Sequence, residues 1–331
     1  MPDAVEVAFH HAACQLLREG SRAVVAVSGG GDSVALLHLT ARLAAKRRPE
    51  IVVAHLDHAL RRGSGADLRF VAALAAKLAL PCVTLRKDVR AARQKGESLE
   101  EAARRVRRSF LTETARSLAA DVIATGHTLD DQAETILMRL ARGAGPTAWS
   151  AMTPAGPGPV VKPLLGIERV ALRGWLGRRR LSFRDDPSNS DLAFDRNRVR
   201  RLVIPVLAKA LNPAAARHLV ESAARFREDA VYLDALAHER FGALAARRGD
   251  KLVVDAAAWE QLPHPLAARV ARIALAEAGC DPRRISSKHV ASVLALAAAA
   301  SGSSVDLPGP TGARRRGRLV EFGPCVFPTK S

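Results

Sequence analysis

The stretch AVVAVSGGGDSVALLHL at residues 23–39 constrains the fold more than any other part of the chain. Residues 23–27 are apolar and rich in valine, which is typical of a strand buried on both faces. Apolar side chains then recur at helical spacing, at Val34, Leu36, Leu37 and Leu39. The three glycines in between let backbone N–H groups approach an oxyanion, and the helix N-terminus adds partial positive charge. The stretch predicts a strand, a phosphate-binding loop and a helix.

The loop excludes two common nucleotide-binding motifs. It lacks the lysine of the G-x-x-x-x-G-K-[ST] pattern, and its glycines do not fit G-x-G-x-x-G, so neither a Walker NTPase nor a dinucleotide-binding unit is favoured. The simpler alternative is a tight strand-to-helix turn in which Ser28 or Asp32 only caps the helix.

Composition indicates two domains and a polyanionic partner. A chain of 331 residues is long for one compact core. Its 51 Lys plus Arg and 33 Asp plus Glu give a formal charge of +18, which favours nucleic acid as a partner. Aromatic residues make up only 4%, so base stacking cannot be the main source of affinity. Arginines cluster at Arg104, Arg105, Arg107 and Arg108, at residues 178–180 and at residues 314–316.

The cysteines and the apolar segments indicate a cytoplasmic protein. Cys14, Cys82, Cys280 and Cys325 lie far apart and form no C-x-x-C pair, which argues against a zinc ribbon, an iron–sulfur site or a disulfide framework. No basic, apolar signal peptide opens the sequence, and no apolar run reaches the roughly 18 residues of a membrane span. We therefore expect reduced thiols and no membrane association.

Further βα units follow the first. Short β-rich runs at 51–54, 82–85 and 121–124 alternate with helical patterns near 67–79 and 98–119. This alternation predicts an α/β fold with a doubly wound, mostly parallel sheet. The segments at 28–33, 55–61 and 125–135 would then emerge together at the carboxyl edge of the sheet, where such folds bind ligands.

Two of these segments carry unusual polar groups. His55, Asp57, His58 and Arg61 crowd one strand end, although a solvated loop is the simpler interpretation. Thr128 and Asp131 could form a capping box. Asp130 and Glu134, four residues apart, place like charges on one helical face, which destabilises a helix unless a cation lies between them. The pattern favours Mg²⁺ or an ammonium group there.

Several longer blocks carry a family resemblance. They are SGGGDS at 28–33, HLDHALR at 55–61, LEEAARRVRR at 99–108, GHTLDDQAETILMRLARGAG at 126–145, KPLL at 162–165 and DDPSNSDLAFDRNRVRRLVIPVL at 185–207. With these blocks the chain resembles the tRNA(Ile)-lysidine synthetases, which belong to the ATP pyrophosphatases of the PP-loop type. The related enzymes that thiolate tRNA use cysteines or an iron–sulfur site, and suitably placed cysteines are missing here.

The resemblance implies a two-step ligase. ATP, with Mg²⁺, adenylates the C2 oxygen of the wobble cytidine in the tRNA(Ile) with a CAU anticodon, and the ε-amine of free L-lysine then displaces AMP. Two alternatives stay open: another PP-loop ATP pyrophosphatase acting on tRNA or on a small metabolite, and a non-catalytic RNA-binding protein. The oligomeric state is also open, with a homodimer among the possibilities.

The resemblance also implies roles for individual residues. Catalytic roles fall to Asp32, Asp131 and His127, with Asp32 also placing the metal ion. ATP contacts fall to Ser28, Gly29, Gly30, Gly31, Asp32, Ser33 and His58. Substrate contacts fall to Asp130, Asp131, Glu134, Arg104, Arg107, Arg196 and Arg198. One departure from the family pattern is Arg108, which stands where a tyrosine is usual.

The sequence changes character beyond Pro205. We expect a catalytic domain over 1–207 and a smaller, mainly helical domain over 213–331 that binds tRNA or substrate. Helical patterns cover 213–245, 263–278 and 287–300, with short strands at 252–254, 305–307 and 318–322. Longer members of the family carry a further C-terminal domain, which we do not expect here. The basic run at 314–318 is then a candidate RNA contact.

Overall fold

A computed structural model describes residues 3–47, 49–60, 63–143, 152–156, 158–185 and 191–324. Arg61, the end of the GHT block, the DPSN turn and Cys325 lie outside these residues. The chain divides into two compact units, Met1–Ala224 and Arg225–Ser331, and the division falls within one long helix, α10 (Ala215–Leu244).

The first unit contains a five-stranded parallel sheet in the order β3-β2-β1-β4-β5. The strands are β1 (Arg22–Ala26), β2 (Glu50–Asp57), β3 (Cys82–Arg86), β4 (Val122–Ala124) and β5 (Val160–Val161). This confirms the predicted doubly wound α/β fold. The strand order reverses between β1 and β4, which is the position where such sheets open a crevice for ligands.

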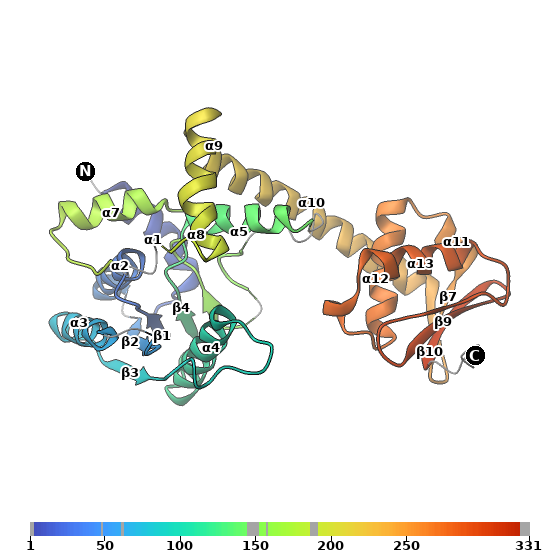
Figure 1. The fold of residues 1–331 in the computed structure, drawn as a ribbon, viewed down its shortest axis with the longest axis horizontal. Helices are drawn as coiled ribbons and strands as arrows, with labels where there is room; N and C mark the ends of the chain where they lie inside the picture. The colour runs from blue at the N-terminus through green and yellow to red at the C-terminus, as the bar shows by residue number, and fades with distance from the viewer. Residues whose placement is uncertain are drawn as a thin grey trace. The chain divides into compact units, whose positions relative to one another are not determined.

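Helices cover both faces of this sheet (Figure 1). The helices α1 (Ala4–Leu16), α2 (Gly31–Arg47), α3 (Ser64–Lys77) and α7 (Arg169–Arg178) share one core with the strands, and α4 (Leu99–Ser117) packs on the other face. The unit also contains α5 (Leu129–Ala141), α8 (Asp195–Arg198), the π-helical turn η2 (Val199–Val203), α9 (Ile204–Ala210) and the first part of α10.

Alternate strand residues face the two helical layers. Val25 and Val53 pack in one core with apolar residues of α1, α2, α3 and α7. Val24 and Ala54, one position along, pack instead against Phe110 of α4. Successive side chains of a strand point to opposite faces, and helices cover both faces of this sheet. The strands are therefore rich in valine and have no polar side.

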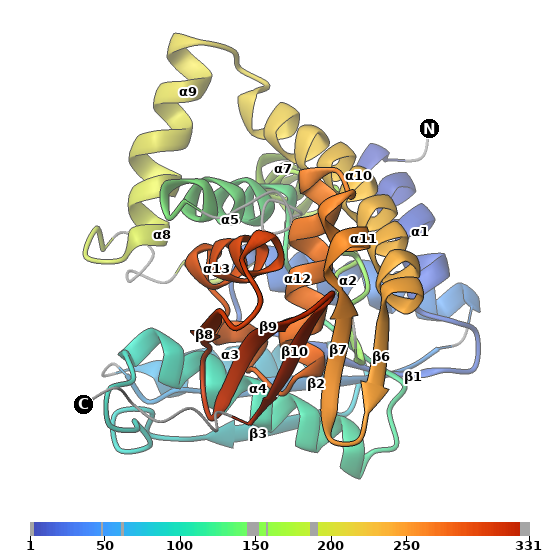
Figure 2. The same ribbon diagram turned by 90° about the vertical axis from the view of Figure 1, so that its right-hand side faces the viewer.

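The second unit contains helices and an antiparallel sheet, whose strands lie side by side in Figure 2 in the order β6-β7-β10-β9-β8. The strands are β6 (Ala245–Arg248), β7 (Lys251–Asp255), β8 (Ser304–Asp306), β9 (Thr311–Arg316) and β10 (Leu319–Pro324). The helices are α11 (Ala256–Glu260), α12 (His264–Glu277), the 3-10 turn η3 (Pro282–Arg284) and α13 (Ser287–Ala298). Trp259, Phe322, Val270 and Leu275 lie in its buried core. A smaller second domain is confirmed, with an antiparallel sheet that β6 and β9 enlarge beyond the three expected strands, while its predicted bounds of 213–331 stay a prediction.

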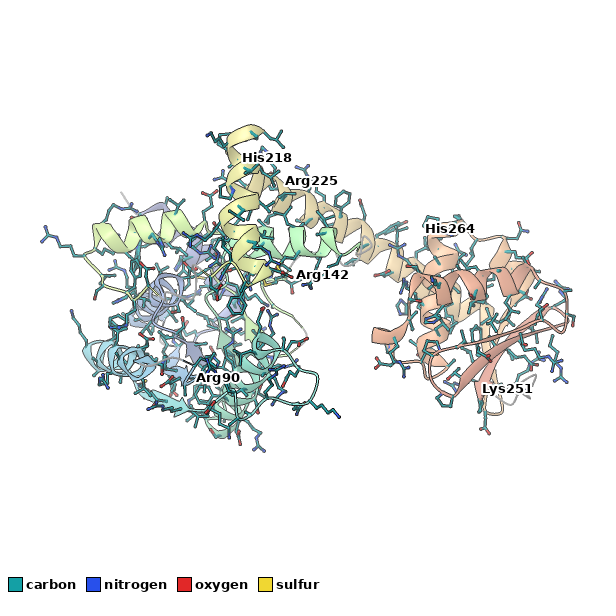
Figure 3. The ribbon with its side chains drawn as sticks, in the orientation of Figure 1. Arg90, Arg142, His218, Arg225, Lys251 and His264 are labelled. Atoms are coloured by element: carbon teal, nitrogen blue, oxygen red, sulfur yellow. The ribbon has the colours of Figure 1, made fainter. Side chains whose placement is uncertain are left out.

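The basic run at 314–318 is split by β9 and the following turn. Arg314 and Arg316 are exposed, whereas Arg315 shares the face of buried Ala313, and its Nε and Nη1 atoms are buried without a hydrogen-bond partner among the described residues. Across the sheet, the Lys251 Nζ atom lies 3.2 Å from Glu321 Oε2 (Figure 3). The run therefore presents two separate faces and not one continuous stripe.

None of the helices in the described residues has the length and apolar composition of a membrane span.

Candidate functional site

The loop after β1 is held by its two serines. The Ser33 hydroxyl donates to the Gly30 carbonyl oxygen at 2.9 Å and accepts from the Ser28 backbone N–H at 3.1 Å. The two serine hydroxyls also lie 3.1 Å apart. These bonds shape the loop from inside, so that the backbone N–H groups at the start of α2 remain available for an anion.

Two glycines are required by the backbone. Gly29 has φ +95°, in the left-handed region that other residues rarely adopt. Gly126, after β4, lies so close to the loop that an added Cβ would be 3.2 Å from the backbone of Asp32 and Ser33. The segment after β4 therefore packs directly on the phosphate-binding loop, as the sequence predicts for the carboxyl edge of the sheet.

Asp32, in the first turn of α2, is paired with an arginine that the sequence did not single out. The Arg169 Nε atom, at the start of α7, lies 2.9 Å from Asp32 Oδ2. The Asp32 side chain is 23% exposed, which leaves it accessible from the loop. Burial raises the pKa of Asp32 above its ordinary value, against the opposing effect of Arg169.

The carboxylates of α5 are positioned by the predicted capping box. The Thr128 hydroxyl accepts from the Asp131 N–H, and Asp131 Oδ2 accepts from the Thr128 N–H at 2.8 Å. Thr128 and Glu134 are fully buried, and Asp131 is buried too. Asp130, in contrast, accepts a hydrogen bond from the Arg169 backbone N–H at 2.7 Å.

Three arginines supply the cations that this acidic face needs. Arg169 Nη2 and Arg196 Nη2 lie 3.0 and 2.9 Å from Asp131 Oδ1. Arg196 Nε and Arg200 Nε lie 2.6 and 2.7 Å from Glu134 Oε2 and Oε1. The like-charge pair on α5 is thus offset by the chain itself, through charge-assisted hydrogen bonds from two other segments.

The arginines stabilise the ionised form of Asp131. Although burial opposes ionisation, Arg196 and Arg169 lower the pKa of Asp131 below its ordinary value. Its two oxygens already accept from these arginines and from Thr128. Asp131 therefore stays ionised, holds Arg169 and Arg196 by its charge, and is a weak proton acceptor.

Three histidines lie after or within strands at the carboxyl edge of the sheet. His127 Nδ1 lies 2.9 Å from the Thr125 hydroxyl, and burial lowers the pKa of His127 to about 4. At neutral pH its imidazole is therefore uncharged. Burial also lowers the pKa of His58, at the end of β2. His55, buried nearby, contacts the Val27 carbonyl through Nδ1 at 2.7 Å, and its Nε2 has no partner among the described residues.

The other arginines expected at the site lie in different surroundings. Arg198 binds the carbonyl oxygens of Leu192 and Ala193 and pairs with Asp195. Residues 196 and 200 share a helical face that residue 198 does not, so the structure brings Arg200 to the carboxylates and not Arg198.

Arg142, at the end of α5, also pairs with Asp195 (Figure 3). Arg104 is exposed and pairs with Glu100 one turn away. On the same helix, desolvation of the Arg107 guanidinium and the charge of Arg104 lower the pKa of Arg107.

A second candidate site is a shallow groove of about 530 Å³ along the outer face of α4. Its lining residues are Arg105, Arg108, Ser109, Thr112, Glu113 and Arg116. Arg105 is paired with Glu97, whereas Arg108 and Arg116 are exposed and make no ion pair within the described part of the chain. Free guanidinium groups beside hydroxyls are suited to phosphate oxygens.

The residues around Asp32 fit Mg²⁺ shared with a substrate. Mg²⁺ is usually held by one or two carboxylates together with substrate phosphates and water. Asp32 adjoins the phosphate-binding loop and is partly exposed. Within the described ranges no group of three His, Cys, Asp or Glu residues is placed to hold a metal ion alone. The donor set therefore suits an ion that arrives with a nucleotide.

A family model described as a PP-loop domain matches residues 4–207. The chain belongs to the PP-loop domain family. A second model, described as a TilS substrate binding domain, matches residues 255–320 within the smaller unit.

Curated relatives match most of the chain. The tRNA(Ile)-lysidine synthase of Geobacter sulfurreducens is 43% identical over 83% of this chain and 59% of its own length. That of Thermus thermophilus is 41% identical over 89% of this chain and 55% of its own length. The chain thus spans somewhat more than half the length of these relatives. Among solved structures, the U34-tRNA thiolase NcsA of Methanococcus maripaludis has a TM-score of 0.59 at 16% identity and covers 68% of this chain and 78% of its own, a likeness in fold alone.

Proposed function

We propose that this chain ligates L-lysine to C2 of the wobble cytidine of the tRNA(Ile) with a CAU anticodon, at the expense of ATP. The observation that carries the proposal is the 2.9 Å contact between Asp32 and Arg169. It joins a loop suited to phosphate to a cluster of carboxylates and arginines suited to an amino acid. The names of the curated relatives support the same activity.

The proposed chemistry has two steps. The C2 oxygen of the cytidine attacks the α-phosphorus of ATP, the bond to the β-phosphate oxygen breaks, and pyrophosphate leaves. The uncharged ε-amine of lysine then attacks C2, the C2–O bond breaks with AMP as the leaving group, and the amine loses its proton. Mg²⁺ would offset phosphate charge during the first step.

The residues have separate proposed roles in these steps. The loop from Ser28 to Ser33 holds the pyrophosphate part of ATP, with Asp32 beside it for the metal ion. Asp130, Asp131 and Glu134 set the negative potential for the lysine ammonium, and Arg196 can bind the lysine carboxylate. His127 is uncharged near neutral pH and is our candidate for accepting a hydrogen bond from the attacking amine, whose proton then passes to water, since a pKa of about 4 makes His127 a weak base.

The RNA partner is supported by charge. The formal net charge is +18, and the arginines of the site are paired with carboxylates, so the excess positive charge lies elsewhere in the chain. We propose that Arg108 and Arg116 in the groove of α4 contact the RNA backbone, together with Arg104 and Arg107 nearer the site. The proposed setting is the cytoplasm, where the free thiols of Cys14, Cys82 and Cys280 would stay reduced.

Transfer of labelled lysine tests the proposal. The protein is incubated with ATP, Mg²⁺, labelled lysine and either tRNA(Ile) with a CAU anticodon or the same tRNA with a GAU anticodon. We expect label in the CAU tRNA only, with AMP and pyrophosphate formed in equal amounts. Pyrophosphate release with ATP and a small metabolite alone would instead identify a different PP-loop enzyme. Binding of RNA without ATP cleavage would leave only an RNA-binding role.

A further inference from the structure

Arg169 contacts carboxylates from both halves of the candidate site. Its Nε lies 2.9 Å from Asp32 Oδ2 on α2, and its Nη2 lies 3.0 Å from Asp131 Oδ1 on α5. Its Nη1 lies 3.4 Å from Glu134 Oε1. Only 15% of the side chain is exposed. In the described chain, Arg169 is the one residue whose side chain joins the phosphate-binding loop to the α5 carboxylates.

The remaining arginines can hold Asp131 and Glu134 of α5 without Arg169. Arg196 contacts both Asp131 and Glu134, and Arg200 contacts both oxygens of Glu134. Asp32 is different, because Arg169 is the only cation that it contacts among the described residues. Movement of Arg169 would therefore leave Asp131 and Glu134 paired with Arg196 and Arg200, and would take the guanidinium away from Asp32 and from Asp130, whose Oδ1 lies 3.9 Å from Arg169 Nη1.

The backbone of Arg169 is held separately from its side chain. Its N–H donates to Asp130 Oδ2 at 2.7 Å, at the first residue of α7. A phosphate chain in the loop after β1 would bring several negative charges beside the guanidinium. The phosphate oxygens would compete with Asp32 Oδ2 for the N–H donors of the Arg169 guanidinium. While Arg169 is bound at Oδ2 of Asp32, its positive charge disfavours a metal ion at the same carboxylate.

We propose that Arg169 is a positioning residue that couples the ATP site to the lysine site. When the loop is empty, its guanidinium binds Asp32 and the carboxylates of α5. When ATP binds, the guanidinium leaves Asp32 and contacts a phosphate oxygen. The inference rests on the proposed function and adds that ATP binding prepares the site for lysine. Departure of the guanidinium makes room, and negative potential, for the lysine ammonium at Asp131. ATP therefore raises the affinity for lysine, and by linkage lysine raises the affinity for ATP by the same factor.

Calorimetric titration of lysine tests this coupling without turnover. Lysine is titrated into the whole chain, alone and in the presence of Mg²⁺ and α,β-methylene-ATP, which cannot be cleaved between the α and β phosphates. For the unaltered protein we expect the analogue to tighten lysine binding by about 5-fold or more, the lower end of measured couplings.

Arg169→Gln should abolish the coupling and shift the two affinities in opposite directions. Lysine should bind at least as tightly as in the unaltered protein, because a competing cation is gone, while the nucleotide binds about 10-fold weaker or more, as for the loss of a charged hydrogen bond. Arg173→Gln is the matched control, since Arg173 lies one turn further along α7, is exposed, and contacts Asp185 and the Phe183 ring but none of the carboxylates of α2 and α5. It should retain the unaltered coupling.

The outcomes separate this inference from the proposed function. If the unaltered protein binds both ligands with no mutual effect, the coupling is disproved, although the proposed function stands. That measurement needs no variant, so it decides the matter even if Arg169→Gln does not fold. Equal weakening of both ligands in Arg169→Gln would show a merely structural role. Failure of the unaltered protein to bind lysine or the nucleotide at all would contradict the proposed function itself.

Discussion

Arginines in two regions of the first unit have opposite surroundings. Arg169, Arg196 and Arg200 are half-buried or more and contact the carboxylates of α2 and α5. Arg108 and Arg116, on the outer face of α4, are exposed and have no ion pair in the described ranges. The two sets lie in one compact unit, yet only the first set is fixed in direction by its partners.

The difference indicates what each set can recognise. A guanidinium held by two carboxylates keeps one geometry and discriminates between ligands, at a cost in desolvation that its partners must offset. A free guanidinium in water attracts any phosphate over roughly the Debye length of 8–10 Å and is sensitive to salt. We therefore expect substitutions in the first set to affect catalysis and folding, and substitutions in the second set to affect only RNA affinity.

The largest expected effect is that of Asp32→Asn. The variant keeps the size of the side chain but removes the charge that faces Arg169 and the proposed metal ion. Lysine transfer should fall by about two orders of magnitude or more, since several kcal/mol of metal-assisted stabilisation are lost. Circular dichroism should show the unaltered fold. Pyrophosphate release at the unaltered rate would remove Asp32 from the site.

Glu134→Gln should lower the free energy of unfolding by about 2 kcal/mol. This lies below the usual 3–5 kcal/mol for a broken buried pair because the partner arginines keep some contact with water. The matched control is Glu100→Gln on α4, whose exposed pair with Arg104 should contribute less than about 0.5 kcal/mol. Urea denaturation measures both. Equal losses in the two variants would mean that burial does not distinguish the two regions.

Replacing both free arginines of α4 should weaken tRNA binding in a salt-dependent way. In Arg108→Ala/Arg116→Ala, the slope of log affinity against log salt should become shallower by roughly 1.5, because two arginines no longer neutralise RNA phosphates. Arg42→Ala/Arg173→Ala removes the same charge from exposed, paired positions and should leave the slope nearly unchanged. Filter binding at several salt concentrations measures both. A matching change in the control would mean that only net charge matters.

The last expected effect concerns His127 and is confined to acidic pH, so that it vanishes under the neutral conditions of the other tests. Since burial lowers the pKa of His127 to about 4, the unfolded chain binds a proton between pH 6.5 and 4 that the folded chain does not. This residue should therefore destabilise the fold as pH falls through that range, by at most about 1.4 kcal/mol per pH unit, and have no effect above it. His127→Asn should flatten this part of the stability curve. Replacing the exposed His218 with Asn should not.

Local patterns predicted much of the first unit. The valine-rich strand, the glycines and the helical repeat after them are adjacent in sequence, so the loop and its strand could be inferred from spacing alone. The capping box at Thr128 was predicted in the same way and is present. The convergence of three segments at one edge followed from the topology of parallel βα units, and Gly126 packs on the loop as this requires.

Tertiary contacts explain what the sequence could not reveal. Arg169 follows the KPLL block without any motif of its own, and its importance comes from the approach of α7 to α2 and α5. Arg200 could have been found, because its i+4 spacing from Arg196 puts both on one face. The strands β5, with two residues, and β6, with the sequence AARR, have no alternating pattern that could identify them.

The Thr128 cap also sets the rotational phase of α5. Each added residue turns an α-helix by about 100°, since a turn takes 3.6 residues. If the helix began one residue earlier or later, Asp131 and Glu134 would rotate by more than a quarter of a turn away from the arginines that now contact them. Gly126 is held against the loop, and Thr128 starts the helix. The number of residues between them therefore determines which way the carboxylates of α5 face. An insertion of a single residue there should be tolerated far less well than a longer insertion in the loop before α4.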